Sequence, residues 1–375
     1  MLKAFILGIS TRTPSAESPL KLVETPTHAA GIIILDYKLG CHGSENSSIV
    51  NRMSILQFTG PSPSICVAQP TQHVAALSRV FASQPQDIRS PLVEMTLAAN
   101  GRGEVSFDGL FVATRDHRIV GAAWCHLAAG RIAVVWPAQV VADETRSTAS
   151  KLMESLEDYI SSMPVDLVQA VLTESHSSEA RSLESAGFSH SADLLYLVCP
   201  CENFPSSQIE TSLEFDSYTD KTAQRLVDVI LKSYQGTLDC PALDGIRDIQ
   251  DVLEGYKHVG SFEPGRWFIV RHHQEDVGCL LLADHPDANQ WELVYMGLAP
   301  EARGNRWGLQ IARHALWLAN QAGRSQMLLA VDQDNQPARN AYAAAGFEIC
   351  DRRSVFLRRL THIASSSGLG YRRAA

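Results

Sequence analysis

Several features are missing from this 375-residue sequence, and each absence excludes a class of protein. No apolar run approaches the 18 or more residues that a membrane-spanning helix needs. The eight cysteines lack metal-type pairs, since Cys199-Pro200-Cys201 is not a Cys-x-x-Cys site, and the thirteen histidines include no His-Glu-x-x-His. The net charge of −9 argues against nucleic acid as a general partner. We therefore expect no metal, no membrane partner, no nucleic-acid partner, and a cytoplasmic protein with reduced thiols.

Two common phosphate-binding motifs are missing as well. No Lys follows Gly308 as a Walker loop requires, and the Gly-x-Gly-x-x-Gly spacing of a dinucleotide fold does not occur at this loop. What is present is the stretch 303–309 (Arg-Gly-Asn-Arg-Trp-Gly-Leu), between a strand-like run at 291–298 and a helix-like pattern that ends at Gly323. Gly304 and Gly308 allow backbone N–H groups at a helix N-terminus to approach an anion. The stretch predicts a phosphate cradle, with a strand–turn–helix corner packed through glycines as the alternative.

The residues after this loop favour the cradle. Gln326 to Asp332 reads as a buried strand, Asn335-Gln336-Pro337-Ala338 as a helix start, and Gly346 ends an Ala-rich helix that contains Tyr342. A further strand follows over 348–357. This order resembles the second half of the GNAT superfamily of N-acetyltransferases, whose Arg/Gln-x-x-Gly-x-Gly loop would end at Gly308. The resemblance covers about 65 residues.

The resemblance implies acetyl-CoA as a co-substrate and identifies the residues that would bind it. Backbone groups of Met296 and Leu298 would pair with the pantetheine arm as an added strand does. Asn335 would bond the same arm, although helix capping explains this residue nearly as well. The implied cofactor-binding set is Met296, Leu298, Arg303, Gly304, Asn305, Arg306, Trp307, Gly308, Leu309 and Asn335.

Arg306 departs from the family pattern, because it stands where the loop usually has Gly. Its side chain could obstruct the pyrophosphate or force a different backbone angle, or its guanidinium could fold onto a phosphate. We expect binding to be retained.

Two residues are candidates for acid–base chemistry. Transfer of an acyl group from a thioester needs a neutral amine, and deprotonating one near pH 7 costs roughly 4.6 kcal/mol. Glu292 lies on the strand before the loop, where many family members carry a base, and a carboxylate on a strand face is the alternative. Tyr342 matches the family's general acid, which would protonate the departing thiolate, and an aromatic packed on a short helix is the alternative.

The length predicts about two domains, and the first half repeats the second weakly. Gly187-Phe188 matches Gly346-Phe347, an offset of 159 residues that places Trp291–Leu298 on a mostly apolar run, Ile132–Gln139. The same offset places Arg303 on Glu144, Gly304 on Thr145, Gly308 on Ala149 and Tyr342 on Leu183, so each important residue is replaced. Glu144 would also bring a negative charge to the position of a pyrophosphate. The first half therefore resembles an acetyltransferase domain that has lost its cofactor loop, with a chance similarity of two α/β segments as the alternative.

These observations predict an α/β (α+β) fold of two tandem acetyltransferase-type domains, each a mixed, mostly antiparallel sheet flanked by helices. We place a flexible or poorly defined extension at 1–67, the degenerate domain at 68–203, the acyl-CoA-binding domain at 204–360 and a disordered tail at 361–375. The chain would be a monomer with pseudo-dimeric domains or a homodimer.

The predicted function is direct transfer of an acetyl group from acetyl-CoA to an amine of a small molecule or a protein. A non-catalytic acyl-CoA-binding or scaffold protein is the first alternative. A transferase that uses another activated donor, such as an aminoacyl carrier, is the second. The acceptor itself is not identified by the sequence, although Tyr234 and Asp239 could contact an amine, or Asp239 could simply form a turn.

Overall fold

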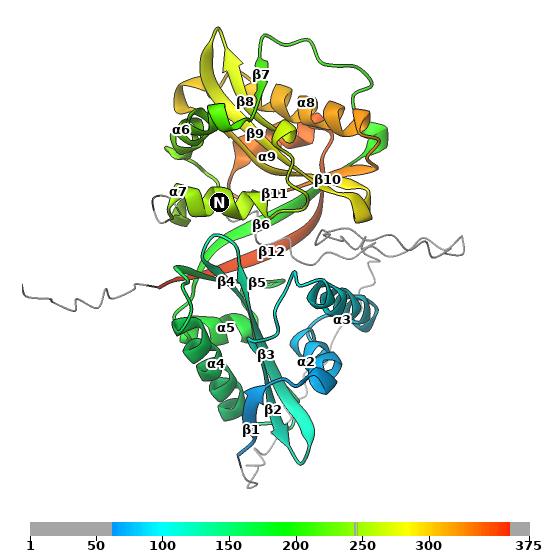
Figure 1. Ribbon diagram of the computed structural model, residues 1–375, viewed down its shortest axis with the longest axis vertical. Helices are drawn as coiled ribbons and strands as arrows, with labels where there is room; N and C mark the ends of the chain where they lie inside the picture. Colours follow the sequence, from blue (N-terminus) through cyan, green and yellow to red (C-terminus); the bar gives the residue numbers. More distant parts are fainter. Residues whose placement is uncertain (1–61, 244, 246, 361–375) are drawn as a thin grey trace, which may run out of the picture.

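The computed structural model describes residues 62–243, 245 and 247–360, and within them one sheet of twelve strands crosses the whole molecule (Figure 1). The strand order is β1-β2-β3-β4-β5-β12-β6-β11-β10-β9-β8-β7. Position by position, the order from one edge mirrors the order from the other, with each strand of the first half matched by a strand of the second. Most of the extension predicted at 1–67 and the tail predicted at 361–375 lie outside the described residues.

The first half contains six strands and four α-helices among the described residues. Its strands are β1 (Ser64–Val67), β2 (Leu110–Arg115), β3 (Arg118–Ala128), β4 (Ile132–Val140), β5 (Leu167–Leu172) and β6 (Ser189–Pro200). Its helices are α2 (His73–Val80), α3 (Gln86–Gly101), α4 (Arg146–Ser161) and α5 (Ser178–Ser185). Because β1 pairs with β2, residues 64–67 belong to this sheet and not to the predicted extension.

The second half repeats this order of elements. Its strands are β7 (Glu214–Ser217), β8 (Trp267–His272), β9 (Glu275–His285), β10 (Gln290–Leu298), β11 (Gln326–Asp332) and β12 (Glu348–Arg359). Its helices are α6 (Ala223–Tyr234), α7 (Ile249–Lys257), α8 (Trp307–Gln321) and α9 (Gln336–Ala345). Among the described strands only β4–β5 and β10–β11 are parallel pairs, so the sheet is mixed and mostly antiparallel, as predicted.

The two halves exchange their last strands. Strand β6 of the first half pairs with β11, and β12 of the second half pairs with β5. The exchanged strands also pair with each other, antiparallel, in the middle of the sheet (Figure 1). The predicted division between residues 203 and 204 remains a prediction for the chain, but in space each half is completed by a strand of the other.

Helices cover both faces of the sheet, because apolar side chains point to both faces of the central strands. In the second half, α6 and α7 pack into one apolar cluster, while α8 and α9 pack into another on the opposite face. In the first half, α4 and α5 share one cluster and α2 and α3 share another. The α6–α7 cluster also includes Ile132 and Leu167 of the first half, so the core is continuous between the halves.

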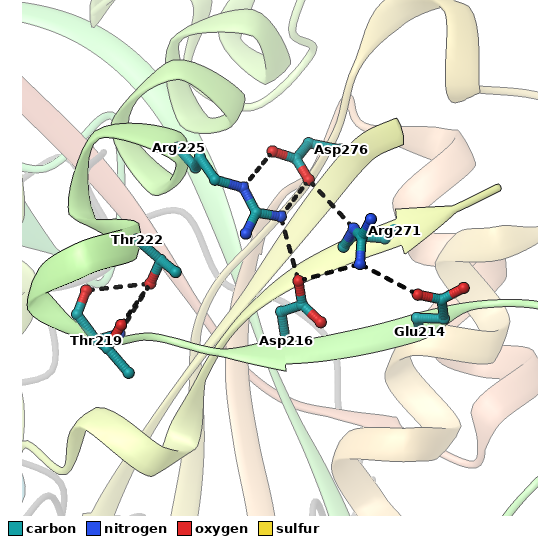
Figure 2. Close-up of polar contacts among 7 residues, drawn as sticks. All are labelled: Glu214, Asp216, Thr219, Thr222, Arg225, Arg271 and Asp276. Atoms are coloured by element: carbon teal, nitrogen blue, oxygen red, sulfur yellow. Dashed lines mark hydrogen bonds and ion pairs between the residues drawn. The ribbon is translucent and has the colours of Figure 1, made fainter. Parts of the chain in front are cut away.

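A network of charged side chains holds the outer edge of the second half (Figure 2). Arg225 of α6 donates to Asp276 of β9 at 2.6 Å and contacts Asp216 of β7 at 3.2 Å. Arg271 of β8 contacts Glu214 at 3.3 Å and Asp216 at 3.4 Å. These ion pairs connect α6 to three strands. Since the groups are partly exposed, each pair contributes about 1 kcal/mol or less.

Candidate functional site

Strands β10 and β11 of the second half separate part of the way along their length. The two strands pair only from Gln290–Gln326 to Glu292–Leu328. Strand β10 stays paired with β9 as far as Leu298, with a register shift between Leu293 and Tyr295. The other edge of β10 is therefore not paired with β11 after Glu292. Backbone groups on such an edge can pair with an extended ligand, and Met296 and Leu298 lie on this part of the strand.

The N-terminus of α8 lies beside the end of this strand. Within the part of the chain that the structure describes, no protein group accepts a hydrogen bond from the N–H groups of residues 304–309. An added Cβ at Gly308 would lie 3.9 Å from Cβ of Ala341 on α9 and 4.0 Å from Cε of Met296 on β10. Packing therefore does not require a glycine there. Donors at a helix N-terminus without a described protein acceptor fit the pyrophosphate of an acyl-CoA.

Arg306 adopts the left-handed conformation, with φ of +58°, and is the residue that precedes α8. The loop thus keeps a backbone angle that favours glycine, at a cost of order 1–3 kcal/mol for another residue. The Arg306 side chain is exposed, and it forms no ion pair with any described residue. Obstruction of the pyrophosphate by this side chain and contact of its guanidinium with a phosphate both remain predictions.

Arg303 uses its guanidinium within the fold. Its Nη2 donates to the Ser233 carbonyl at 2.9 Å, its Nη1 to the Gly236 carbonyl at 3.1 Å, and its Nε to the Leu298 carbonyl at 3.3 Å. The first two carbonyls lie at the C-terminal end of α6, where a cation is favourable. Arg303 therefore ties α6 to the loop. Its own N–H donates to the Pro300 carbonyl at 3.2 Å, and its contact with the cofactor remains a prediction.

The remaining predicted loop residues also contribute mainly through the backbone. Trp307 packs beside His272, with ring centroids 4.6 Å apart, and Leu309 packs against the α8–α9 cluster. The Asn305 side chain donates to the Ala302 carbonyl at 3.2 Å. These side chains shape the turn, and the N–H groups of residues 304–309 have no described protein acceptor.

In the first half, the N-terminus of the corresponding helix, α4, already contacts a carboxylate of the protein, that of Glu144. The Glu144 carboxylate accepts from the Thr145 N–H at 2.9 Å and from the Thr148 hydroxyl at 3.0 Å, at the start of α4. It also pairs with Arg115 at 3.1 Å, and its side chain is only 3% exposed. Burial raises the pKa of Glu144, but these hydrogen bonds outweigh burial and leave the pKa lowered. A carboxylate thus occupies the helix N-terminus that the second half leaves open.

The alignment by a constant offset needs correction at this point. Five residues connect β4 to α4, whereas eight connect β10 to α8. Relative to the helix starts, Arg306 therefore matches Thr145, and Gly308 matches Ser147 instead of Ala149. The strands are aligned through the first residue pair of each parallel ladder. This pair is Ile132 and Leu167 in β4–β5, and Gln290 and Gln326 in β10–β11. Ile132 therefore matches Gln290 instead of Trp291.

Glu292 lies at the point where the strands separate and is fully buried. His285, at the end of β9, contacts its carboxylate, with Nε2 3.0 Å from Oε2. The histidine is also fully buried. A carboxylate in this position cannot meet an amine from solvent without movement of the groups that cover it, so its role as a base remains a prediction. The sequence does not single out His285, because a strand end followed by a proline is typical of an ordinary turn.

Tyr342 and Asn335 both lie on α9. Tyr342 is 1% exposed and packs edge-to-face with Phe347, with ring centroids 5.7 Å apart. The Asn335 side chain accepts from the Ala338 N–H at 3.3 Å and caps the helix. The structure thus shows the capping role for Asn335, while contacts of either residue with an acyl-CoA remain predictions.

Several polar groups that the sequence does not single out lie near the end of β11 and the C-terminal end of α6. Asp332, the last residue of β11, accepts from the Cys240 N–H at 3.0 Å, and its own N–H donates to Asp239 at 3.2 Å. Burial raises the pKa of Asp332, and hydrogen bonds from backbone N–H groups oppose this. The Tyr295 and Ser233 hydroxyls lie 2.8 Å apart in the same region. The sequence indicates Tyr234 and Asp239 as possible contacts of an amine, whereas Asp332 has only the pattern of a polar residue at the end of a strand.

Neither a metal centre nor a membrane span is found in the described part of the chain. No group of three or more His, Cys, Asp or Glu residues there could hold a metal ion. None of the described helices is long and apolar enough to cross a membrane.

Comparisons with known proteins bear on this site. Residues 237–347 match the family model described as the acetyltransferase (GNAT) family. No curated protein matches the sequence. Among solved structures, a GCN5-related N-acetyltransferase from Sphaerobacter thermophilus is 13% identical, with a TM-score of 0.55 over 79% of this chain and 95% of that one.

Another similar structure is a GCN5-related glucosamine N-acetyltransferase region of a fungal multi-domain GH3 β-N-acetylglucosaminidase. It is 11% identical, with a TM-score of 0.53, and covers 80% of this chain and 38% of that one. A tandem GNAT protein from the clavulanic acid biosynthesis pathway is 14% identical, with a TM-score of 0.44 over 79% of this chain and 97% of that one. At these identities, the first two likenesses establish the fold.

Proposed function

We propose that the second half transfers an acetyl group from acetyl-CoA to an amine, starting from the match of residues 237–347 to the acetyltransferase (GNAT) family. The observation that carries the proposal is the contrast between the two helix N-termini. At the start of α4, the Glu144 carboxylate accepts a hydrogen bond from a backbone N–H group. At the start of α8, no described residue accepts a hydrogen bond from the N–H groups. One of two related halves is therefore arranged to bind a phosphate-bearing co-substrate.

Acetyl-CoA would supply the activated acyl group, and this chain would supply binding and proton transfer. The N–H groups of residues 304–309 would hold the pyrophosphate, and backbone groups of Met296 and Leu298 would orient the arm along β10. The loop and β10 together would fix the reacting group between β10 and β11. This assignment is supported by the edge of β10 that does not pair with β11 after Glu292 and by the N–H groups of residues 304–309, which have no described protein acceptor.

For proton transfer, we propose Tyr342 as the acid and Glu292 as the base. Tyr342 lies on α9, the helix that also carries Ala341, the residue nearest to a side chain added at Gly308. Its phenol would donate a proton to the departing thiolate. Glu292 would accept the amine proton once the acceptor has displaced the groups that cover it, with His285 as its hydrogen-bond partner.

A non-catalytic acyl-CoA-binding protein is the second candidate. The complete burial of Glu292 is the observation that favours it, because a base needs access to the proton that it accepts. In this case the loop would bind acetyl-CoA and no amine would react.

Two experiments on the full chain separate these readings. Isothermal titration with acetyl-CoA should show one site per chain, and no binding would overturn both candidates. Turnover should then be measured over a panel of amines for the wild type, Tyr342→Phe and the control Tyr159→Phe, which removes a phenol from α4 of the first half. We expect Tyr342→Phe to lower kcat by about 10²–10⁴-fold with acetyl-CoA affinity retained. Equal rates in all three proteins would remove Tyr342 as the acid, and binding without turnover would favour the scaffold.

A further inference from the structure

The first half contains a pocket far from the acetyltransferase loop in the sequence. It has a volume of about 450 Å³ and lies between α2, the start of α3 and the β2–β3 hairpin. Its lining includes three arginines, one histidine and no acidic residue; the residues used below are Ala75, Arg79, Arg89, His117, Arg118 and Ile119. A pocket of several hundred cubic ångströms is large enough for a small molecule.

The three arginines have no acidic partner in the described part of the chain. Arg79 and Arg118 form neither an ion pair nor a side-chain hydrogen bond with a described residue. Arg89 donates through Nε and Nη2 to the Gln84 carbonyl, at 3.3 and 2.9 Å, which fixes the guanidinium and leaves Nη1 as a further donor. Arg118 is exposed and Arg79 and Arg89 are half-buried, so their mutual repulsion is modest in solvent, and their combined positive potential favours an anion. Such a grouping is also unusual in a chain whose net charge is −9.

The matching place in the second half contains an ion pair (Figure 2). Arg225 is the third residue of α6, and Asp276 is the second residue of β9. Their ion pair joins the helix to the hairpin at 2.6 Å. The matching residues of the first half are Ala75, third in α2, and Ile119, second in β3.

Neither Ala75 nor Ile119 can form such a bridge, and both line the pocket. The pocket therefore exists where the second half has an internal ion pair. The charges that surround it are all of one sign, unlike the three acids and two arginines of the network in the second half.

We propose that this pocket binds a small phosphorylated molecule. Arginine offers planar pairs of N–H donors that match phosphate oxygens, and charge-assisted hydrogen bonds of this kind are the strong ones. Arg79 on α2, Arg89 on α3 and Arg118 on the hairpin would contact the phosphate from three elements, and His117 adds a further donor beside it. The site is independent of the proposed acetyltransferase activity, because it uses only residues of the first half.

The probe is inorganic pyrophosphate, titrated into the full-length protein by calorimetry in the presence of saturating acetyl-CoA. We expect saturable binding of one pyrophosphate per chain that weakens as salt is raised. Arg79→Gln and Arg118→Gln should each weaken it at least tenfold, which corresponds to about 1.4 kcal/mol. The matched control is Arg102→Gln, which removes the same charge from an arginine paired with Glu104 outside the pocket, and it should bind as the wild type does.

A second variant tests the comparison between the halves. Ala75→Glu introduces an acid at the place of the bridge in the second half, so it should compete with the anion for the arginines, weaken pyrophosphate binding at least tenfold and leave the thermal midpoint unchanged or raised. No saturable binding, or equal binding by wild type and all four variants, would overturn the proposal. Equal affinity for citrate and pyrophosphate would overturn the assignment to a phosphate.

Discussion

Replacing Gly308 by alanine should make the protein more stable and a poorer binder of acetyl-CoA. The added methyl group would lie at ordinary contact distances, 3.9 Å from Ala341 and 4.0 Å from Met296, so the fold can accept it without movement. Gly308 lies in the first turn of α8, and glycine is up to about 1 kcal/mol less favourable than alanine inside a helix. For a chain of this size, a gain of that order raises the melting temperature by roughly 1–2 °C.

The same methyl group would point into the space between the loop, β10 and α9. If the N–H groups of residues 304–309 hold the pyrophosphate, the anion must move away from them. Each charge-assisted hydrogen bond contributes about 1.5–3 kcal/mol, so weakening one of them lowers acetyl-CoA affinity roughly 10- to 100-fold. Stability and affinity should therefore change in opposite directions.

The assay combines differential scanning calorimetry with titration of acetyl-CoA. Gly101→Ala is the matched control, because this glycine ends helix α3 in the first half and an added Cβ meets nothing within 4 Å. It should raise stability or leave it unchanged, and it should not alter affinity. An unchanged affinity in Gly308→Ala would refute the assignment of the loop, and a lower melting temperature would refute the packing argument.

Three further predictions concern the fold. Glu144→Ala should destabilise the protein by about 1–3 kcal/mol in urea denaturation, because the Thr145 N–H, the Thr148 hydroxyl and the Arg115 guanidinium all lose the buried carboxylate that they contact. Since the pKa of Glu144 is lowered in the fold, its contribution should be present above about pH 4.3 and lost as pH falls through the folded pKa. Burial lowers the pKa of His314 to about 4, so wild-type stability should fall between pH 6.5 and 4 by up to about 3 kcal/mol, and His314→Gln should fall less. Fragments 62–203 and 204–360 should each fail to unfold cooperatively alone but do so when mixed, as followed by calorimetry; cooperative unfolding of either fragment would contradict the importance of strand exchange.

Much of the second half is predictable from the sequence, because local signals there agree with one another. The helix start after Arg306, the cap at Asn335 and the left-handed Gly346 each follow from residue chemistry within a few positions. The side-chain contacts of the site are harder to predict from the sequence. Arg303 turns to carbonyls of α6 some 70 residues earlier, and His285 meets Glu292 only because a turn reverses the chain. Such contacts depend on tertiary packing, which a single sequence does not encode locally.

The strand exchange also escapes prediction from the sequence. Strands β6 and β12 follow the same Gly-Phe landmark and have the same length, so either could complete either half. Local pattern cannot decide between them, since both are apolar strands bordered by similar elements. The choice depends on the whole sheet, in which β6 and β12 pair with each other.

This exchange has a consequence for synthesis on the ribosome. Strand β5 (Leu-Val-Gln-Ala-Val-Leu) has β12 as its partner, and β12 is the last strand to be made among the described residues. At about 5–20 residues per second, the intervening chain takes roughly 10–40 s to appear. During that time an apolar strand edge of the first half has no partner from its own sheet, and such edges promote aggregation. The nascent protein is therefore most vulnerable after its first half has emerged, and a slow translation rate in the second half would lengthen that period.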